Sequence, residues 1–352
     1  MALFTIKNVS IKGVSGVVPS KKVSTYDYDF FSTKDAETFI NTVGIEERYV
    51  ATDTECASDL CHLAAENLIA DLGWDKESID LLTFESVTAD YRTPPTSCIL
   101  QHRLGLPETC MTFDLPMGCC GFIYSVAIAG KMMQQGDIKR AILLIGDTIT
   151  RMSSPKDKSR VPLFGDCGTA VALEFNENAD DIIIDMNTSG KGYEALITPH
   201  SGFRHQVTPE SFEYEDFGNG VVRAPIHSVI NGMNVFAFAI SRPPRAINAL
   251  LEKYNIDKEN DIDYYLIHQA NKMIVDKVYK KANLPQEKVP YNLNKFANLG
   301  GASIPMLMVS ELSEELKNKK LRLMASAFGL GLTWGTMLFN TENIVVSKLA
   351  TL

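Results

Sequence analysis

Apolar runs of strand length alternate with helical patterns along most of this chain, and this alternation limits its possible folds more than any other feature. The runs lie at residues 79–84, 141–146, 169–175, 182–186, 264–267 and 321–325. Between them the pattern predicts helices at residues 58–73, 121–135 and 270–282, with Ser58 as a candidate N-cap. Strands that are apolar throughout belong to sheets covered on both faces. The chain is therefore predicted to have an α/β fold.

Composition narrows the function classes. A chain of 352 residues, 45% of them hydrophobic, can bury a substantial core, which excludes a disordered or fibrous protein. No charged segment followed by an apolar run opens the sequence, and no window has the apolar length of a membrane span. We therefore expect a cytoplasmic protein without a membrane partner. The net charge of -9 argues against a nucleic-acid partner, because phosphate binding needs a basic surface.

The cysteines and histidines suggest neither a disulfide framework nor a metal site. The seven cysteines are an odd number in a large chain without a secretion signal. No Cys-x-x-Cys or His-Glu-x-x-His pattern occurs, and His200 and His205 share a polar loop without an evident third ligand. We expect no metal and no cofactor.

A weak internal repeat is present. The Phe-Gly and Gly-Thr pairs within residues 164–171 recur within residues 328–338, about half a chain length later. A duplicated α/β unit would leave such an offset, although Gly-Thr before an apolar strand also recurs by chance.

Cys119 is the strongest candidate nucleophile. It follows a strand at residues 110–115 and a turn, and it lies at the N-terminus of the predicted helix at residues 121–135. Unpaired N–H groups and the macrodipole at a helix start favour a thiolate over a thiol. Gly118 and Gly121 on either side allow close approach of backbone to an acyl group. Since most buried cysteines are inert core residues, the assignment depends on what accompanies Cys119.

Two further residues supply that context. His268 comes at the C-terminal end of the apolar strand at residues 264–267, where α/β sheets carry their reactive groups. Asn298 lies in a turn of small residues that leads into another helix. A strand-end histidine is by default structural, and an asparagine in a turn is by default a turn residue. Their occurrence together with Cys119 is the informative feature.

At these residues the chain resembles the ketoacyl-ACP synthase III family of thiolase-like condensing enzymes. The resemblance covers nearly the whole chain and rests on motifs in a fixed order: Thr42-Val43-Gly44-Ile45-Glu46-Glu47-Arg48, the Cys119 segment, Phe164-Gly165-Asp166, His268-Gln269-Ala270-Asn271, the Asn298 turn, and Phe328-Gly329-Leu330-Gly331-Leu332-Thr333-Trp334-Gly335. The family pattern places the nucleophile two residues before Gly-Phe, which selects Cys119 over Cys120. Cys120 then takes a position usually held by a small residue.

The resemblance implies a five-layered αβαβα fold of two similar halves, a homodimer and a Cys-His-Asn triad. Residues 1–178 would form the half that carries Cys119, and residues 179–352 the half that carries His268 and Asn298. Backbone N–H groups of Cys119 and Leu330 would form the oxyanion hole. An acyl-CoA or acyl-ACP primer would load onto Cys119. A malonyl thioester, carried by acyl carrier protein, would then lose CO2 while His268 and Asn298 donate to its carbonyl oxygen, and its enolate would attack the acyl group.

The sequence disfavours some of the related enzyme activities of this fold and leaves others open. A biosynthetic thiolase would carry a second cysteine in the C-terminal glycine-rich loop, and residues 328–335 contain none. Chain-elongating synthases resemble a Cys-His-His pattern, whereas Asn298 holds the third position here. A polyketide-synthase-like enzyme and an acyltransferase that uses another nucleophile stay open as alternatives. An inactive scaffold subunit of the same fold is disfavoured because all three triad residues are present.

Three regions depart from the family pattern. Thr38 and Thr42 take the places of the tryptophan and arginine that usually clamp the adenine of CoA, so primer donation by CoA or by ACP is open. Met273 replaces an arginine on the helix after His268, where the nearby lysines are a candidate surface for docking acidic ACP or simply a solvated face: Lys272, Lys277, Lys280 and Lys281. Residues 202–220 form a longer loop than usual, either a lid over an acyl tunnel or a loop without function.

Overall fold

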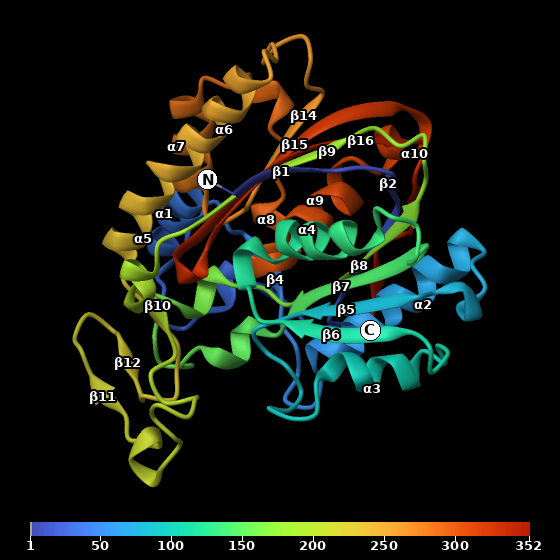
Figure 1. The fold of residues 1–352 in the computed structure, drawn as a ribbon. Coiled ribbons are helices and arrows are strands. Elements are labelled where there is room, and N and C mark those ends of the chain that lie inside the picture. The colour runs from blue at the N-terminus through green and yellow to red at the C-terminus, as the bar shows by residue number, and fades with distance from the viewer. Residues whose placement is uncertain (1) are drawn as a thin grey trace.

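Two large β-sheets and three layers of helices form the body of the computed structural model, which describes residues 2–352 (Figure 1). The first sheet has the order β17 (Val345–Val346), β2 (Val9–Val18), β8 (Cys167–Phe175), β7 (Arg140–Asp147), β5 (Leu81–Glu85) and β6 (Met111–Leu115), with β18 (Ala350–Thr351) also paired to β2. The second has the order β1 (Ala2–Ile6), β9 (Ile182–Thr188), β16 (Thr333–Glu342), β15 (Lys320–Gly329) and β14 (Tyr264–Ile267).

Helices cover both faces of each sheet. Between the sheets lie α4 (Gly121–Met133) and α9 (Ser303–Glu311). The outer face of the first sheet packs against α2 (Ala57–Leu72) and α3 (Thr96–Arg103). The outer face of the second packs against α5 (Gly232–Ala239), α6 (Arg242–Lys253) and α7 (Lys272–Ala282). This is the predicted five-layered αβαβα fold.

The remaining elements are short or lie at the edges. The helices among them are α1 (Thr33–Val43), α8 (Leu293–Phe296) and α10 (Ser313–Asn318). The strands form three small pairs: β3 (Lys22–Ser24) with β4 (Glu47–Tyr49), β10 (Leu196–Ile197) with β13 (Val229–Ile230), and β11 (Glu215–Asp216) with β12 (Val222–Arg223).

The two large sheets repeat one topology, which confirms two similar halves. The order β2-β8-β7-β5 corresponds to β9-β16-β15-β14, and in both series the pairings are antiparallel, antiparallel and parallel. The repeated Gly-Thr pairs lie in the corresponding strands β8 and β16. The division at residue 178 stays a prediction. Both ends of the chain cross it, since β1 joins the second sheet and β17 and β18 join the first.

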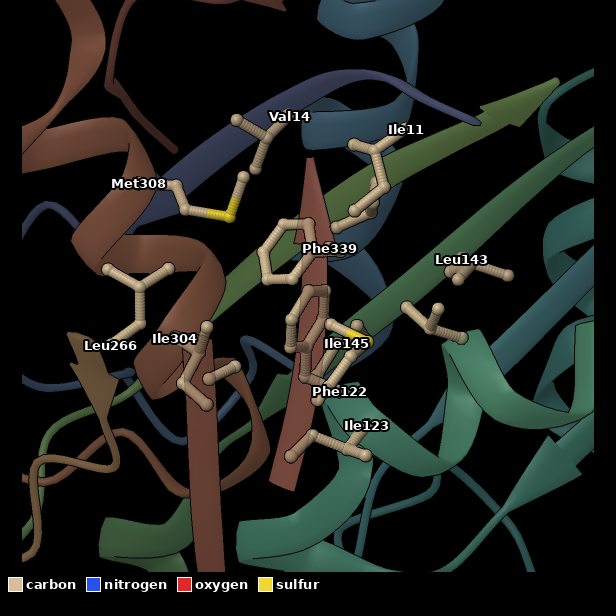
Figure 2. Packing of buried hydrophobic residues seen from close by; sticks show 14 of the residues in the cluster. Ile11, Val14, Phe122, Ile123, Leu143, Ile145, Leu266, Ile304, Met308 and Phe339 are labelled. Atoms are coloured by element: carbon tan, nitrogen blue, oxygen red, sulfur yellow. The ribbon is translucent and has the colours of Figure 1, made fainter. Parts of the chain in front are cut away.

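The core between the sheets fixes the position of α4. Figure 2 shows Phe122 of α4 beside Phe339 of β16, with ring centroids 6.5 Å apart, and Ile304 and Met308 of α9 among side chains from both sheets. A helix buried between two sheets is apolar all round, as the sequence of α4 is. Each fully buried side chain of this kind contributes about 1.5–3 kcal/mol to the free energy of unfolding. The start of α4, next to Cys119, is therefore held by a rigid core.

One predicted helix boundary is wrong. Cys56, and not Ser58, is the N-cap of α2, and the Asp59 carboxylate accepts a hydrogen bond from the Cys56 N–H at 2.9 Å. Ser58 lies inside the helix, buried, where its hydroxyl oxygen has no hydrogen-bond partner among residues 2–352. The acidic residue at the third helical position thus marks the start of this helix better than the serine does.

Candidate active site

One apolar cavity of about 760 Å³ lies where the two halves meet and brings the three candidate catalytic residues together. Cys119 comes from the first half, whereas His268 and Asn298 come from the second, and all three line the cavity. Leu330, the second residue of the expected oxyanion hole, also lines it. The fold thus brings together residues that are far apart in the sequence, as expected from the resemblance to the family.

Cys119 lies in the 3-10 turn Gly118–Cys120 between β6 and α4, two residues before the first residue of the helix. Gly118 precedes it with φ 58°, a conformation that glycine adopts readily. The side chain faces Gly329, where a Cβ atom would come within 2.6 Å of both Cβ and Sγ of Cys119. Glycine at this position is therefore what allows the loop after β15 to approach the sulfur. The neighbouring Cys120 is fully buried in the core between the sheets and does not line the cavity.

The thiol of Cys119 is not an acidic one. Burial raises its pKa to about 12, and the nearby Asp147 and Glu85 carboxyls add to this. The backbone N–H groups of Leu330 and Cys119 itself oppose the shift without reversing it. The expectation that the helix start makes a thiolate is therefore wrong. The charged form loses more hydration in the apolar cavity than the helix start returns.

His268 is a neutral imidazole at the end of β14. It is almost fully buried, and burial lowers its pKa to about 4. The ring stands edge-on to Phe328 with centroids 5.4 Å apart, and Nδ1 has no hydrogen-bond partner among residues 2–352. Its backbone N–H donates to the Ser326 carbonyl at 2.9 Å, which fixes the strand end. A neutral imidazole has one N–H donor and one acceptor nitrogen, and because Nδ1 is buried, Nε2 is the nitrogen that can serve the cavity, as donor or as acceptor according to the tautomer.

Hydrogen bonds to its backbone and to its side-chain oxygen fix the position of Asn298. Its N–H donates to the Leu163 carbonyl and its carbonyl accepts from the Gly165 N–H, both at 3.1 Å. Its Oδ1 accepts from the Gly300 N–H at 3.0 Å, so the amide NH2 remains as the donor toward the cavity. The preceding Ala297 has φ 59° and ψ -159°, a region that favours glycine. Such a conformation persists only where its surroundings impose it.

Gly165 makes this arrangement possible. A Cβ on Gly165 would lie 2.2 Å from the Phe296 carbonyl oxygen, so only glycine lets the two segments pair. Arg48 donates to the Phe164 carbonyl at 2.5 Å, which ties the Gly44-to-Arg48 motif to the same segment. Arg48 and Gly165 thus hold the turns around the candidate triad, and neither of them lines the cavity.

Sequence reasoning missed two buried carboxyl groups near Cys119. Asp147, at the end of β7, lines the cavity, and its Oδ1 accepts from the Ser86 hydroxyl, the Val87 N–H and the Thr88 hydroxyl at 2.8, 2.8 and 3.2 Å. Its Oδ2 has no partner among residues 2–352, and burial raises its pKa to about 6. Its place at a strand end was the one signal that could have identified it.

Glu85 lies beneath the nucleophile turn. It is fully buried in a space left by Gly121 and Gly301, where a Cβ would lie 1.9 and 2.2 Å from its carboxyl atoms. Neither carboxyl oxygen has a hydrogen-bond partner of good geometry within the part of the chain that the structure describes. Burial and the Asp147 carboxyl hold the pKa of Glu85 well above the usual range, and the nearby N–H groups of Gly118 and Met117 offset only part of this shift. A protonated carboxyl group is therefore expected there. Its place in an apolar strand gave no sign of this.

The four candidate docking lysines share α7, whose first turn lies at the cavity. Asn271, Met273 and Ile274 line the cavity, and Met273 is also exposed. Of the lysines, Lys277, Lys280 and Lys281 are exposed. Lys272 is half-buried, and its Nζ lies 2.7 Å from Oδ2 of Asp276, so its charge is already paired.

Thr38 and Thr42 lie exposed on α1, and neither lines the cavity. Their hydroxyls donate to the carbonyls of Lys34 and Thr38 in the same helix, at 2.8 and 2.7 Å. No aromatic or guanidinium side chain therefore stands at these two positions to hold an adenine ring.

The loop at residues 202–220 does not cover the cavity. It contains β11 and, with β12, projects away from the body of the molecule (Figure 1). None of its residues lines the cavity; the segments on either side do, at residues 196–201 and 228–233. Its aromatic side chains point to solvent, with Phe203 83% and Phe212 59% exposed.

Metal-binding clusters and membrane-spanning helices were not expected, and residues 2–352 bear on both. Within that range no cluster of His, Cys, Asp or Glu side chains has the arrangement of a metal site. No described helix is both long and apolar enough to cross a membrane.

Comparison with known proteins finds relatives over nearly the whole chain. The models for the two domains of 3-oxoacyl-[acyl-carrier-protein (ACP)] synthase III match residues 113–192 and, for the C-terminal domain, residues 251–341. A beta-ketoacyl-[acyl-carrier-protein] synthase III of Streptococcus equi is 30% identical over 334 residues, which cover 93% of this chain and 98% of that protein. The corresponding protein of Clostridium perfringens is 31% identical and covers 95% and 99%.

Solved structures extend the agreement to three dimensions. A 3-oxoacyl-(acyl-carrier protein) synthase from Burkholderia xenovorans superposes with a TM-score of 0.93 at 33% sequence identity, covering 99% of each chain. Since the similarity extends over nearly the full length of both the sequence and the fold, this chain belongs to the 3-oxoacyl-[acyl-carrier-protein] synthase III family of condensing enzymes.

Proposed function

We propose that this condensing enzyme loads an acyl primer on Cys119 and joins it to a malonyl thioester by decarboxylative Claisen condensation. The observation that supports this most is the convergence of the candidate nucleophile, both candidate donors and Leu330 on one apolar cavity. An inactive scaffold subunit would have no use for a cavity at which these residues meet.

Loading begins from a neutral thiol. Because the pKa of Cys119 is raised, its proton must leave as sulfur attacks the thioester carbonyl, and the acceptor nitrogen of neutral His268 is the proposed base. The N–H groups of Cys119 and Leu330 hold the oxyanion. When the intermediate collapses, the bond to the donor sulfur breaks and that sulfur takes the proton from His268. The low pKa of His268 favours this return.

Condensation uses His268 and Asn298 as donors. For this step the neutral imidazole is in the tautomer with its proton on Nε2. The malonyl thioester carbonyl oxygen accepts from that N–H and from the Asn298 amide, and the bond to the carboxylate breaks with release of CO2. The resulting enolate attacks the acyl carbonyl on Cys119, the carbon–sulfur bond breaks, and the sulfur takes a proton from solvent, which is the one proton that the condensation consumes. Donors aimed at a developing oxyanion in a dry site typically contribute about 2.7–4 kcal/mol each to lowering the barrier.

The proposed partners follow from the same cavity and from α7. We assign the exposed Lys277, Lys280 and Lys281 to docking of an acidic acyl carrier protein, with the paired Lys272 as a minor contributor. Primer donation by CoA or by ACP, a homodimeric assembly and a cytoplasmic location complete the proposal. Nucleic acid has no place in it, because the net charge is -9.

The test separates the two half-reactions. Asn298→Ala should slow CO2 release from malonyl-ACP by about 10²–10³-fold, since one oxyanion donor is lost, and should change acylation of Cys119 by less than about threefold. Acylation is followed by intact mass in a single turnover, and CO2 by release from labelled malonyl-ACP. Asn318→Ala, on the exposed face of α10, is the matched control.

Three outcomes would count against the assignment. If Asn298→Ala abolished acylation while CO2 release persisted, the division of roles would be wrong. If the wild-type enzyme acylated but released no CO2 with any extender, an acyltransferase that uses another nucleophile would replace the condensation. A condensation product that is extended repeatedly would instead indicate a polyketide-synthase-like enzyme.

A further inference from the structure

Arg160 is a buried cation in the wall of the cavity that contains Cys119. Its exposed fraction is 6%, and its guanidinium lies over the ring of Phe164, 4.7 Å from the centroid. Its one side-chain hydrogen bond within residues 2–352 runs from Nε to the Ser153 hydroxyl at 3.1 Å. Nη1 is buried without a partner. A guanidinium carries five N–H donors, so most of its hydrogen-bonding capacity is unused.

The charges around Arg160 do not balance. Asp157 is the nearby carboxylate, but its Oδ1 already accepts from the Ser159 N–H and hydroxyl at 3.0 and 2.5 Å, and its Oδ2 lies 3.6 Å from Nη1 of Arg223. Two guanidinium groups thus share one carboxylate. Burial lowers the pKa of Arg160 to about 10, which leaves it charged at neutral pH.

A buried charge of this kind is unfavourable unless an anion pairs with it. Arg160 also lies close enough to Cys119 for the charge of a Cys119 thiolate to raise the pKa of Arg160. The missing anion is therefore expected near the acylation site, inside the cavity; Asp147 also lines this cavity but is not among the charged groups that shift the pKa of Arg160. Guanidinium groups match carboxylates in particular, through two parallel hydrogen bonds.

Building on the proposed function, we propose that Arg160 recognises a carboxylate at the far end of the acyl primer, so that the preferred primer is a carboxyacyl thioester. The malonyl extender also carries a carboxylate, but that group leaves as neutral CO2. An ion pair that is lost in the transition state would stabilise only the ground state and would slow the reaction. A primer carboxylate keeps its charge throughout, so its pairing with Arg160 has no such effect.

The experiment compares acyl groups of one length. Glutaryl-CoA, monomethylglutaryl-CoA and pentanoyl-CoA are each incubated with the enzyme, and the initial rate of acylation of Cys119 is followed by intact mass. The wild-type enzyme should acylate with glutaryl-CoA about thirtyfold or more faster than with the other two, since a buried hydrogen-bonded charge pair is at stake. This comparison needs no variant and does not depend on how substitutions affect folding.

Substitutions of Arg160 then test whether this residue causes the preference for glutaryl-CoA. Arg160→Met should remove the preference by slowing glutaryl loading about thirtyfold or more while changing pentanoyl loading less than about threefold, and Arg160→Lys should keep part of it. Arg151→Met is the matched control, because the guanidinium of Arg151 is exposed and donates to the Glu55 carbonyl. Melting temperatures show that each variant is folded.

Every other outcome would overturn the inference. Equal acylation rates of the wild-type enzyme with the three primers would show that it does not recognise a primer carboxylate. A loss in Arg160→Met that falls on malonyl-ACP turnover alone would assign the guanidinium to the extender, and equal losses on all substrates would make it a structural residue. If no acyl group of any kind loaded on Cys119, the proposed function itself would fail, which is a different result from loading without preference.

Discussion

Alkylation of Cys119 should be slow at neutral pH and should rise steadily with pH. Iodoacetamide reacts with the thiolate, and a thiol whose pKa rises from 9.0 to about 12 has about 10³-fold less thiolate at pH 7. His268 offers no cationic partner, because burial lowers its pKa to about 4. The rate should therefore increase about tenfold per pH unit from pH 6 to pH 10 without a plateau.

The assay is a time course of alkylation by peptide mass at each pH. Cys98 is exposed on α3 and serves as an internal reference that must react faster at pH 7. Restricted access to the cavity would lower every rate by one factor and leave the slope unchanged, so the slope tests the pKa. A plateau with a midpoint below about pH 8 that disappeared in His268→Ala would show a thiolate–imidazolium pair and refute the reasoning.

Two further predictions concern charge. Reversing Lys277 and Lys280 to glutamate should raise the KM for an ACP-linked substrate, more so at low salt, and leave a small thioester mimic unaffected; equal effects on both substrates would exclude docking. Asp147→Asn should raise the free energy of unfolding at pH 7.5 by up to about 3 kcal/mol, because the folded state raises the pKa of Asp147 to about 6 and so disfavours its ionised form. Urea unfolding should show that gain shrinking as the pH falls from about 6 through 3.8, because Asp147 is protonated in both the folded and the unfolded state only below its ordinary pKa of 3.8; a gain independent of pH would contradict it.

Much of this arrangement could be predicted from the sequence. The apolar strands and the family motifs are local signals, so they predicted both the layered fold and the order of Cys119, His268 and Asn298 along the chain. The meeting of these three residues in one cavity follows from the fold. His268 follows a strand and Asn298 lies in a turn of one half, while Cys119 lies in the turn before a helix of the other half.

The electrostatic character of the site could not be predicted in this way. The pKa of Cys119 depends on burial and on two carboxyls from other strands, whereas the sequence shows only its place before a helix. Arg160 follows a run of charged residues that is typical of a solvent-exposed loop. Only the fold brings it to the cavity. Desolvation is a property of the assembled structure, so short motifs carry little information about it.

The central claim is that Cys119 carries the acyl group, and peptide mapping of the acyl-enzyme tests it most directly. The enzyme is incubated with an acyl-CoA, digested at low pH to preserve the thioester, and the adduct is located by tandem mass spectrometry; Cys120→Ala and Cys119→Ala are treated in parallel. The account predicts an adduct on Cys119 alone, retained in Cys120→Ala and absent in Cys119→Ala, since Cys120 is fully buried in the core. An adduct on Cys120, or normal loading of Cys119→Ala, would contradict it.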